Sequence, residues 1–175
     1  MRQLGAHRKL DPKLVAAFGY FIGVILQEAL LPGLLPGTAS MEPVFCFMAV
    51  LAILGHNSIA IVLALAGGLT FDLLTGQLVG LNALSYFVSV LAVVSVQKNL
   101  VKETLVAPAA VIFAGYLLKE ITYLFVLVSL GMNFLLTRVL AQLAFSSAVN
   151  ACFGAGLYWL LHFRMGLEVK VDRDY

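Results

Sequence analysis

The chain has 175 residues, of which 62% are hydrophobic and 11% are charged, and its mean hydropathy is +1.00. This composition excludes an ordinary soluble domain and is typical of an integral membrane protein. The net charge of +2 is too small to indicate a nucleic-acid partner.

Six apolar segments follow one another along the chain, joined by short polar loops. The first ends at Pro32 and Gly33, which stop a helix. The second begins after Glu42-Pro43, because proline suits the first helical turn, and it is short. A break at residues 56–58 separates it from the third. A bilayer-spanning helix needs about 20 apolar residues, and the expected spans are residues 14–31, 44–55, 59–74, 81–96, 105–130 and 140–163.

The basic residues test this number of spans. Six spans place nine of the eleven lysines and arginines on one side, leaving Arg138 on the other side and Lys119 within the fifth span. The nine are Arg2, Arg8, Lys9, Lys13, Lys98, Lys102, Arg164, Lys170 and Arg173. The positive-inside rule then predicts cytoplasmic termini. Merging the second and third spans would scatter the basic residues, so we reject five spans and expect residues 1–175 to form one all-α, polytopic membrane domain with six transmembrane helices.

Polar side chains recur at one depth of these spans. At about 1.5 Å per helical residue, they lie roughly 20 Å from the cytoplasmic side. The members of this polar layer are Glu28, Asp72, Asn82, Lys119 and Glu120. An unpaired charge inside a bilayer is costly, and Lys119 can neutralise Asp72, Glu28 or Glu120; we expect it to pair across helices with Asp72. The layer is either a buried polar knot that fixes helix register or a site that binds a ligand or a partner helix.

The sixth span carries a stripe of small and polar residues at i, i+4 spacing. The stripe consists of Gln142, Ser146, Asn150 and Gly154. Such a face allows close helix contact. It either packs inside this chain or docks another membrane protein.

The sequence offers no pattern typical of a catalytic or metal-binding site. The sequence contains no nucleophile motif, glycine-rich phosphate loop or paired-carboxylate arrangement. Cys46 and Cys152 lie far apart in apolar runs, and His7, His56 and His162 show no ligand spacing. We therefore expect neither an enzyme, a metal site nor a cofactor.

One segment carries a family resemblance. Residues 67–84 read GGLTFDLLTGQLVGLNAL. Three further features accompany this segment, namely the Glu42-Pro43 helix start, the break at residues 55–57 and SSAVNACFGAGLYWLL at residues 146–161. Together they resemble MreD, the rod shape-determining membrane protein family. The resemblance covers most of the chain, and the segment 67–84 is its most specific part.

The resemblance implies a role without catalysis. MreD-like proteins belong to the bacterial cell-elongation (rod) complex in the inner (plasma) membrane, where they bind MreC and help to regulate peptidoglycan synthesis and cell shape. The other implied partners are MreB, RodA, a class B penicillin-binding transpeptidase and membrane lipids. The family's fold is similar to that of the S component of energy-coupling-factor (ECF) transporters. The alternative function is therefore that of an S component that binds a vitamin or another small molecule.

Overall fold

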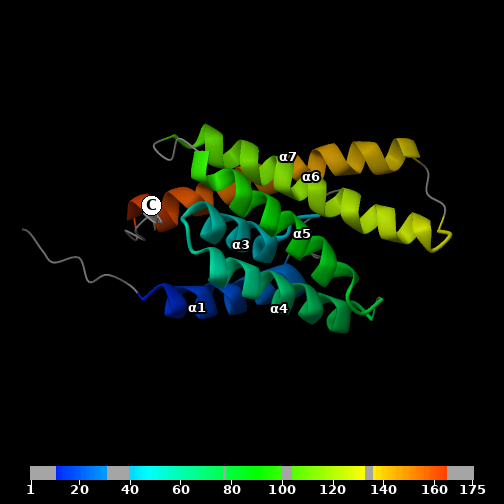
Figure 1. The fold of residues 1–175 in the computed structure, drawn as a ribbon, viewed down its shortest axis with the longest axis horizontal. Helices are drawn as coiled ribbons and strands as arrows, with labels where there is room; N and C mark the ends of the chain where they lie inside the picture. Colours follow the sequence, from blue (N-terminus) through cyan, green and yellow to red (C-terminus); the bar gives the residue numbers. More distant parts are fainter. Residues whose placement is uncertain (1–10, 31–39, 77, 100–103, 133–135, 165–175) are drawn as a thin grey trace, which may run out of the picture.

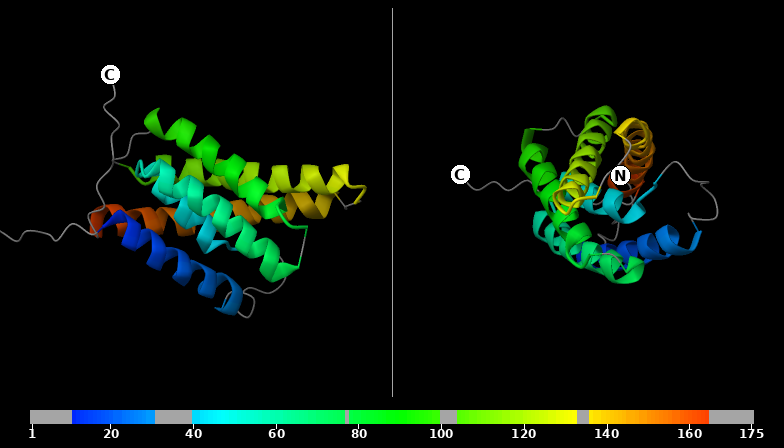
Figure 2. Two further views of the ribbon diagram at one scale, coloured as in Figure 1. Left: turned by 60° about the horizontal axis from the view of Figure 1, so that its bottom comes forward. Right: turned by 90° about the vertical axis from the view of Figure 1, so that its right-hand side faces the viewer.

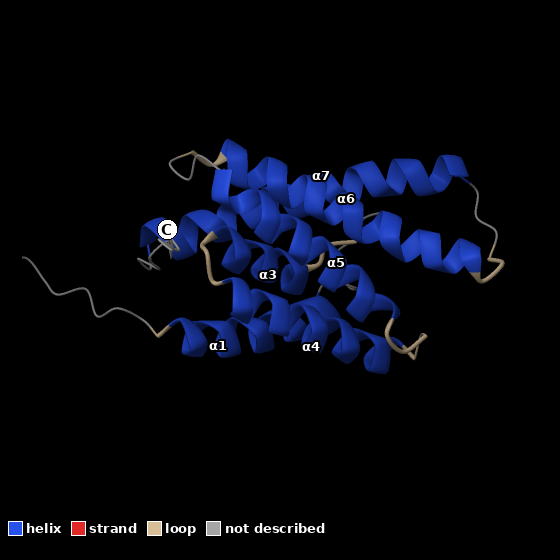
Figure 3. Ribbon diagram, viewed as in Figure 1, coloured by secondary structure: helices blue, strands red, loops and turns tan. Residues whose placement is uncertain are grey.

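The computed structural model describes residues 11–30, 40–76, 78–99, 104–132 and 136–164. All the regular elements in these ranges are helices (Figure 3). They are α1 (Pro12–Ile25), η1 (Leu26–Leu30), α3 (Pro43–Ile53), α4 (Asn57–Thr75), α5 (Leu81–Val96), η2 (Gln97–Asn99), α6 (Val106–Ser129), α7 (Leu136–Trp159) and η3 (Leu160–Arg164). The prediction of an all-α chain is confirmed, with six α-helices in the described part.

Three of the helical segments are long and apolar enough to cross a membrane. They are α4, α6 and the stretch Val139–Phe163 of α7 and η3. α3 and α5 are shorter apolar helices. Large apolar side chains point outward from the bundle, among them Phe18, Val106 and Phe125, which are 68 to 78% exposed. An apolar exterior is the arrangement that lipid requires, because the bilayer core contains no water to solvate polar groups.

The centre of the bundle is α3. All 11 of its residues are buried, and it contacts each of the other five α-helices, as its central position shows (Figure 1). A helix that is hydrophobic all round is expected to be buried in this way. At 1.5 Å per residue α3 is about 16 Å long, or roughly half of a bilayer's hydrocarbon core. Its first residue, Pro43, is buried inside the bundle.

The expected second and third spans are separate helices in the structure. A turn at Gly55, whose φ of +86° favours glycine, divides α3 from α4. α6 carries Pro108 in its first turn, where the missing N–H is tolerated. α7 begins at Leu136, four residues before the expected start of the sixth span.

Most of the basic residues used for the topology prediction lie outside the described residues. These are Arg2, Arg8, Lys9, Lys102, Lys170 and Arg173. The start of α1 and the end of η3, in contrast, are described, and they lie at the same end of the bundle (Figures 1 and 2).

Gly68 allows α4 and α5 to approach closely. A Cβ atom at Gly68 would lie 2.2 Å from the Ala83 Cα atom and 2.4 Å from the Ala83 nitrogen. Both of these are backbone atoms, so no side-chain rotation can relieve the overlap. The turn between the helices contains Gly76 and Gly80, whose φ angles of +64° and +98° also favour glycine. The conspicuous segment 67–84 is thus the tight α4–α5 hairpin.

We predict that Gly68→Ala lowers the thermal stability of the protein in detergent. The added methyl group must push α4 and α5 apart, and overpacking of this kind costs about 1–3 kcal/mol. Gly156→Ala is the matched control, since a Cβ atom there has no neighbour within 4 Å, and its melting temperature should not fall. Equal melting temperatures for Gly68→Ala and the unmodified protein would contradict the close contact.

Candidate functional site

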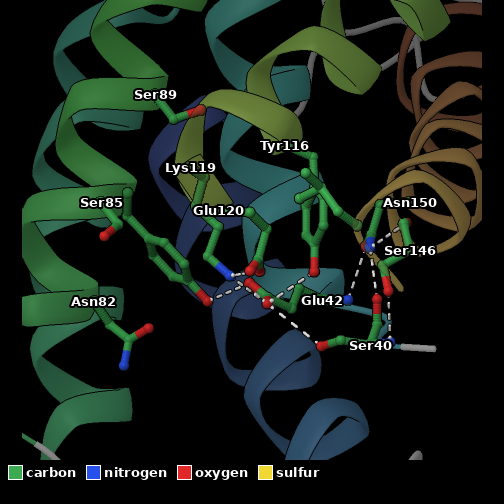
Figure 4. Close-up of polar contacts among 12 residues, drawn as sticks. Ser40, Glu42, Asn82, Ser85, Ser89, Tyr116, Lys119, Glu120, Ser146 and Asn150 are labelled. Carbon is green, nitrogen blue, oxygen red and sulfur yellow. Dashed lines mark hydrogen bonds and ion pairs between the residues drawn. The ribbon is translucent and has the colours of Figure 1, made fainter. Parts of the chain in front are cut away.

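A buried carboxylate, that of Glu42, lies at the start of the central helix. Glu42 is 7% exposed and immediately precedes Pro43, the first residue of α3. Its carboxylate accepts hydrogen bonds from Lys119 Nζ at 2.6 Å, the Tyr86 hydroxyl at 2.7 Å and the Tyr116 hydroxyl at 3.2 Å. Figure 4 shows Lys119 and Tyr116 converging on Glu42 from α6. Glu42 thereby joins α3 to α5 and α6.

Lys119 is equally buried, at 4% exposure. Its Nζ atom lies 2.6 Å from Glu42 Oε1 and 2.6 Å from Glu120 Oε1. The rings of Tyr86, Tyr116 and Tyr123 surround the ammonium, with centroids 5.0 to 5.9 Å away. These contacts compensate a buried cation by ion pairing and by cation–π attraction. Lys119 does pair across helices, but its partner there is Glu42 and not one of the expected carboxylates.

The expected pairing of Asp72 with Lys119 is wrong. Asp72 is fully buried, and its carboxylate binds the first turn of α5. It accepts hydrogen bonds from the backbone amides of Gly80 at 2.7 Å, Asn82 at 2.9 Å and Ala83 at 3.4 Å, and from Asn82 Nδ2 at 3.0 Å. The first amides of a helix lack partners within the helix and carry its positive dipole end. Asp72 therefore caps α5 from the preceding helix, which is a structural role.

The segment before α3 is held by two residues of the α7 stripe. Ser40 N donates to Ser146 Oγ at 3.0 Å, and Asn150 Nδ2 donates to the Ser40 carbonyl at 2.8 Å. The Glu42 amide donates to Asn150 Oδ1 at 2.8 Å, and Figure 4 shows this cluster beside the Glu42 carboxylate. Asn150 and Ser146 thus fix the backbone that delivers Glu42 to the interior.

The remaining stripe residues differ in their surroundings. A Cβ atom at Gly154 would lie 2.6 Å from Ile112 Cδ1, so Gly154 is where α7 packs against α6. Gln142 is exposed. The hypothesis that this stripe docks a partner is therefore wrong for Ser146, Asn150 and Gly154, because all three already contact this chain. These three residues pack inside the chain, which was the other possibility for the stripe.

A polar cavity of about 390 Å³ adjoins the Glu42 carboxylate. Four members of the expected polar layer line it, namely Glu28, Asn82, Lys119 and Glu120, together with Gln142 from the stripe. Asp72 is not among its lining residues. Glu28 lies on η1 with an exposed side chain. The predicted convergence of polar groups from several helices is present, with Glu42 rather than Asp72 at its centre.

Sequence reasoning missed Glu42, Tyr86 and Tyr116. The signal for Glu42 was the shortness of the second span, because a helix shorter than the others must begin inside the membrane if it ends at the same depth as they do. The two tyrosines carried no comparable signal, since an aromatic residue in an apolar helix is ordinary core composition.

The arrangement is that of an enclosed ion pair beside a polar cavity. Among the described residues, no three His, Cys, Asp or Glu side chains are grouped so as to hold a metal ion. The ion pair of Lys119 and Glu42 is instead enclosed by hydrogen-bond donors and rings. It can hold helix positions, and it can present charge to the cavity.

No protein-family model matches the chain, and neither does any curated protein or solved structure. The resemblance to MreD and the similarity to an S-component fold therefore stay predictions.

We predict strong energetic coupling between Glu42 and Lys119. Removing Lys119 strands the Glu42 carboxylate in the interior, and breaking a buried pair costs about 3–5 kcal/mol. A double-mutant cycle with Glu42→Gln and Lys119→Met, followed by thermal unfolding in detergent, should show the double variant to be far more stable than the sum of the single effects implies.

The matched control is a second cycle that combines Asp72→Asn with Lys119→Met. These side chains have separate partners, so their effects should add. Additivity in the first cycle, or coupling of equal size in the second, would contradict the observed pairing.

Proposed function

We propose that the chain is a non-catalytic membrane subunit of the bacterial cell-elongation complex that binds MreC, as its resemblance to MreD implies. The observation that supports this role best is the internal use of its polar groups. Asp72 caps α5, Asn150 holds the start of α3, and Lys119 pairs with Glu42. A bundle fixed in this way, with an apolar exterior, suits a rigid scaffold for partner helices in the membrane.

We further propose six membrane crossings with both termini in the cytoplasm. The common position of the α1 start and the η3 end supports an even number of crossings (Figures 1 and 2). α3 is too short to cross alone. Non-helical backbone at membrane depth is nevertheless tolerated where protein satisfies its polar groups, and the amides of residues 40 and 42 are hydrogen-bonded to α7.

A reporter experiment tests the topology. Alkaline phosphatase, which is active only outside the cytoplasm, should be silent when fused after Tyr175 and active when fused after Leu35. The reverse pattern would exclude cytoplasmic termini.

A co-purification experiment tests the partner. The tagged chain, extracted from a rod-shaped bacterium in mild detergent, should bring down MreC, and cells depleted of the chain should become round. The control is a tagged, unrelated polytopic protein expressed at the same level. Recovery of a transporter ATPase module in place of MreC would overturn the proposal.

The alternative proposal, an S component of an ECF-type transporter, is favoured by one observation. The polar cavity of about 390 Å³ combines tyrosine rings, amides and carboxylates, and its size falls within the range of small-molecule pockets. Recovery of the ATPase module in the co-purification experiment is the outcome that this proposal expects.

A further inference from the structure

The polar cavity carries more negative than positive charge. Carboxylates of Glu28, Glu42 and Glu120 line it, and Lys119 is the one cation among its described lining residues. The Lys119 ammonium contacts both Glu42 and Glu120. It offsets one formal negative charge and leaves two. A cavity of this kind attracts a cation and repels an anion.

An unused acceptor lies in the same cavity. Gln27 lines it, and the Gln27 Oε1 atom is buried without a hydrogen-bond partner in the described part of the chain. A buried acceptor left without a donor is costly. The occupant that would satisfy it carries an N–H or O–H group. Excess negative charge and an unpaired acceptor together indicate a positively charged donor.

The size of the cavity separates an organic cation from a bare ion. No three carboxylates among the described residues are grouped closely enough to hold a metal ion. A volume of about 390 Å³ instead accommodates several non-hydrogen atoms. Tyr86 and Tyr123 add aromatic walls, which favour alkylammonium groups.

We propose that this cavity binds a primary alkylammonium group, supplied by a free amine or by the headgroup of an ethanolamine lipid. The ammonium donates to Gln27 Oε1 and faces the carboxylates of Glu28 and Glu120. Lys119 keeps its place beside Glu42. The inference concerns this chain alone and does not depend on whether MreC binds.

Calorimetric titration of the full chain in detergent tests the proposal with 1,5-diaminopentane as the probe and 1,5-pentanediol as its neutral match. The diamine should bind at least about tenfold more tightly than the diol, and its affinity should fall as salt is added. Glu28→Gln should weaken diamine binding about two- to fivefold, the effect of an exposed charge.

Asp11→Asn is the matched control for the Glu28 variant. It removes the same charge about 25 Å away along α1 and η1, and asparagine preserves the helix cap that Asp11 provides. Its affinity for the diamine should equal that of the unmodified protein. Equal binding of diamine and diol, or equal weakening by both variants, would overturn the proposal.

Repeating the titration in phosphatidylcholine nanodiscs with and without phosphatidylethanolamine separates the two sources. Weaker diamine binding when the ethanolamine lipid is present, with that lipid retained in native mass spectra, assigns the site to the headgroup. Equal binding in both membranes assigns it to a free amine. Absence of diamine binding in both, with no lipid retained, would overturn the proposal.

Discussion

The structure depends on the position of one carboxylate, that of Glu42, at the start of α3, which is the shortest of the six described α-helices. α3 contacts all five other α-helices, so its placement determines how they meet. That placement is fixed at its first turn, where Lys119, Tyr86 and Tyr116 bind the Glu42 side chain and Asn150 accepts from its amide. Hydrogen bonds from α5, α6 and α7 therefore converge on the single residue that immediately precedes α3.

Such an arrangement is better explained by specificity than by stability. A buried ion pair rarely stabilises a protein more than well-packed apolar residues would, since desolvation of the two charges offsets their attraction. Helices in lipid also lack a hydrophobic drive to associate in one register. α3 is apolar along its whole length, so its packing alone discriminates weakly between neighbouring registers. The Glu42–Lys119 pair discriminates strongly, because any slip of α3 leaves the buried Glu42 carboxylate without its cation.

The sequence was sufficient to predict the helices but not to predict which buried charged side chains pair with one another. Each expected span corresponds to a helix, because apolar length and glycine or proline breaks report directly on local structure. The depth of a residue along its helix could also be predicted from the sequence. Four residues expected at one depth, namely Glu28, Asn82, Lys119 and Glu120, line one cavity. The direction in which each side chain points around its helix axis could not be predicted from the sequence. Asp72 and Lys119 share a depth, yet Asp72 faces the α5 start. Gly68 and Gly80 were the available hint, since they bring α5 amides next to α4.

The two buried carboxylates differ in what can replace their partners. Asp72 is bound by backbone amides, which are part of the hairpin and cannot move away without opening it. Glu42 is bound by side chains, which can rotate, and it borders a cavity that also contains Glu28 and Glu120. A ligand can therefore compete for or add to the interactions around Glu42, whereas nothing can enter the cap around Asp72. For this reason the amine site that we propose adjoins the Glu42–Lys119 cluster and not Asp72, although Asp72 is the more conspicuous residue in the sequence.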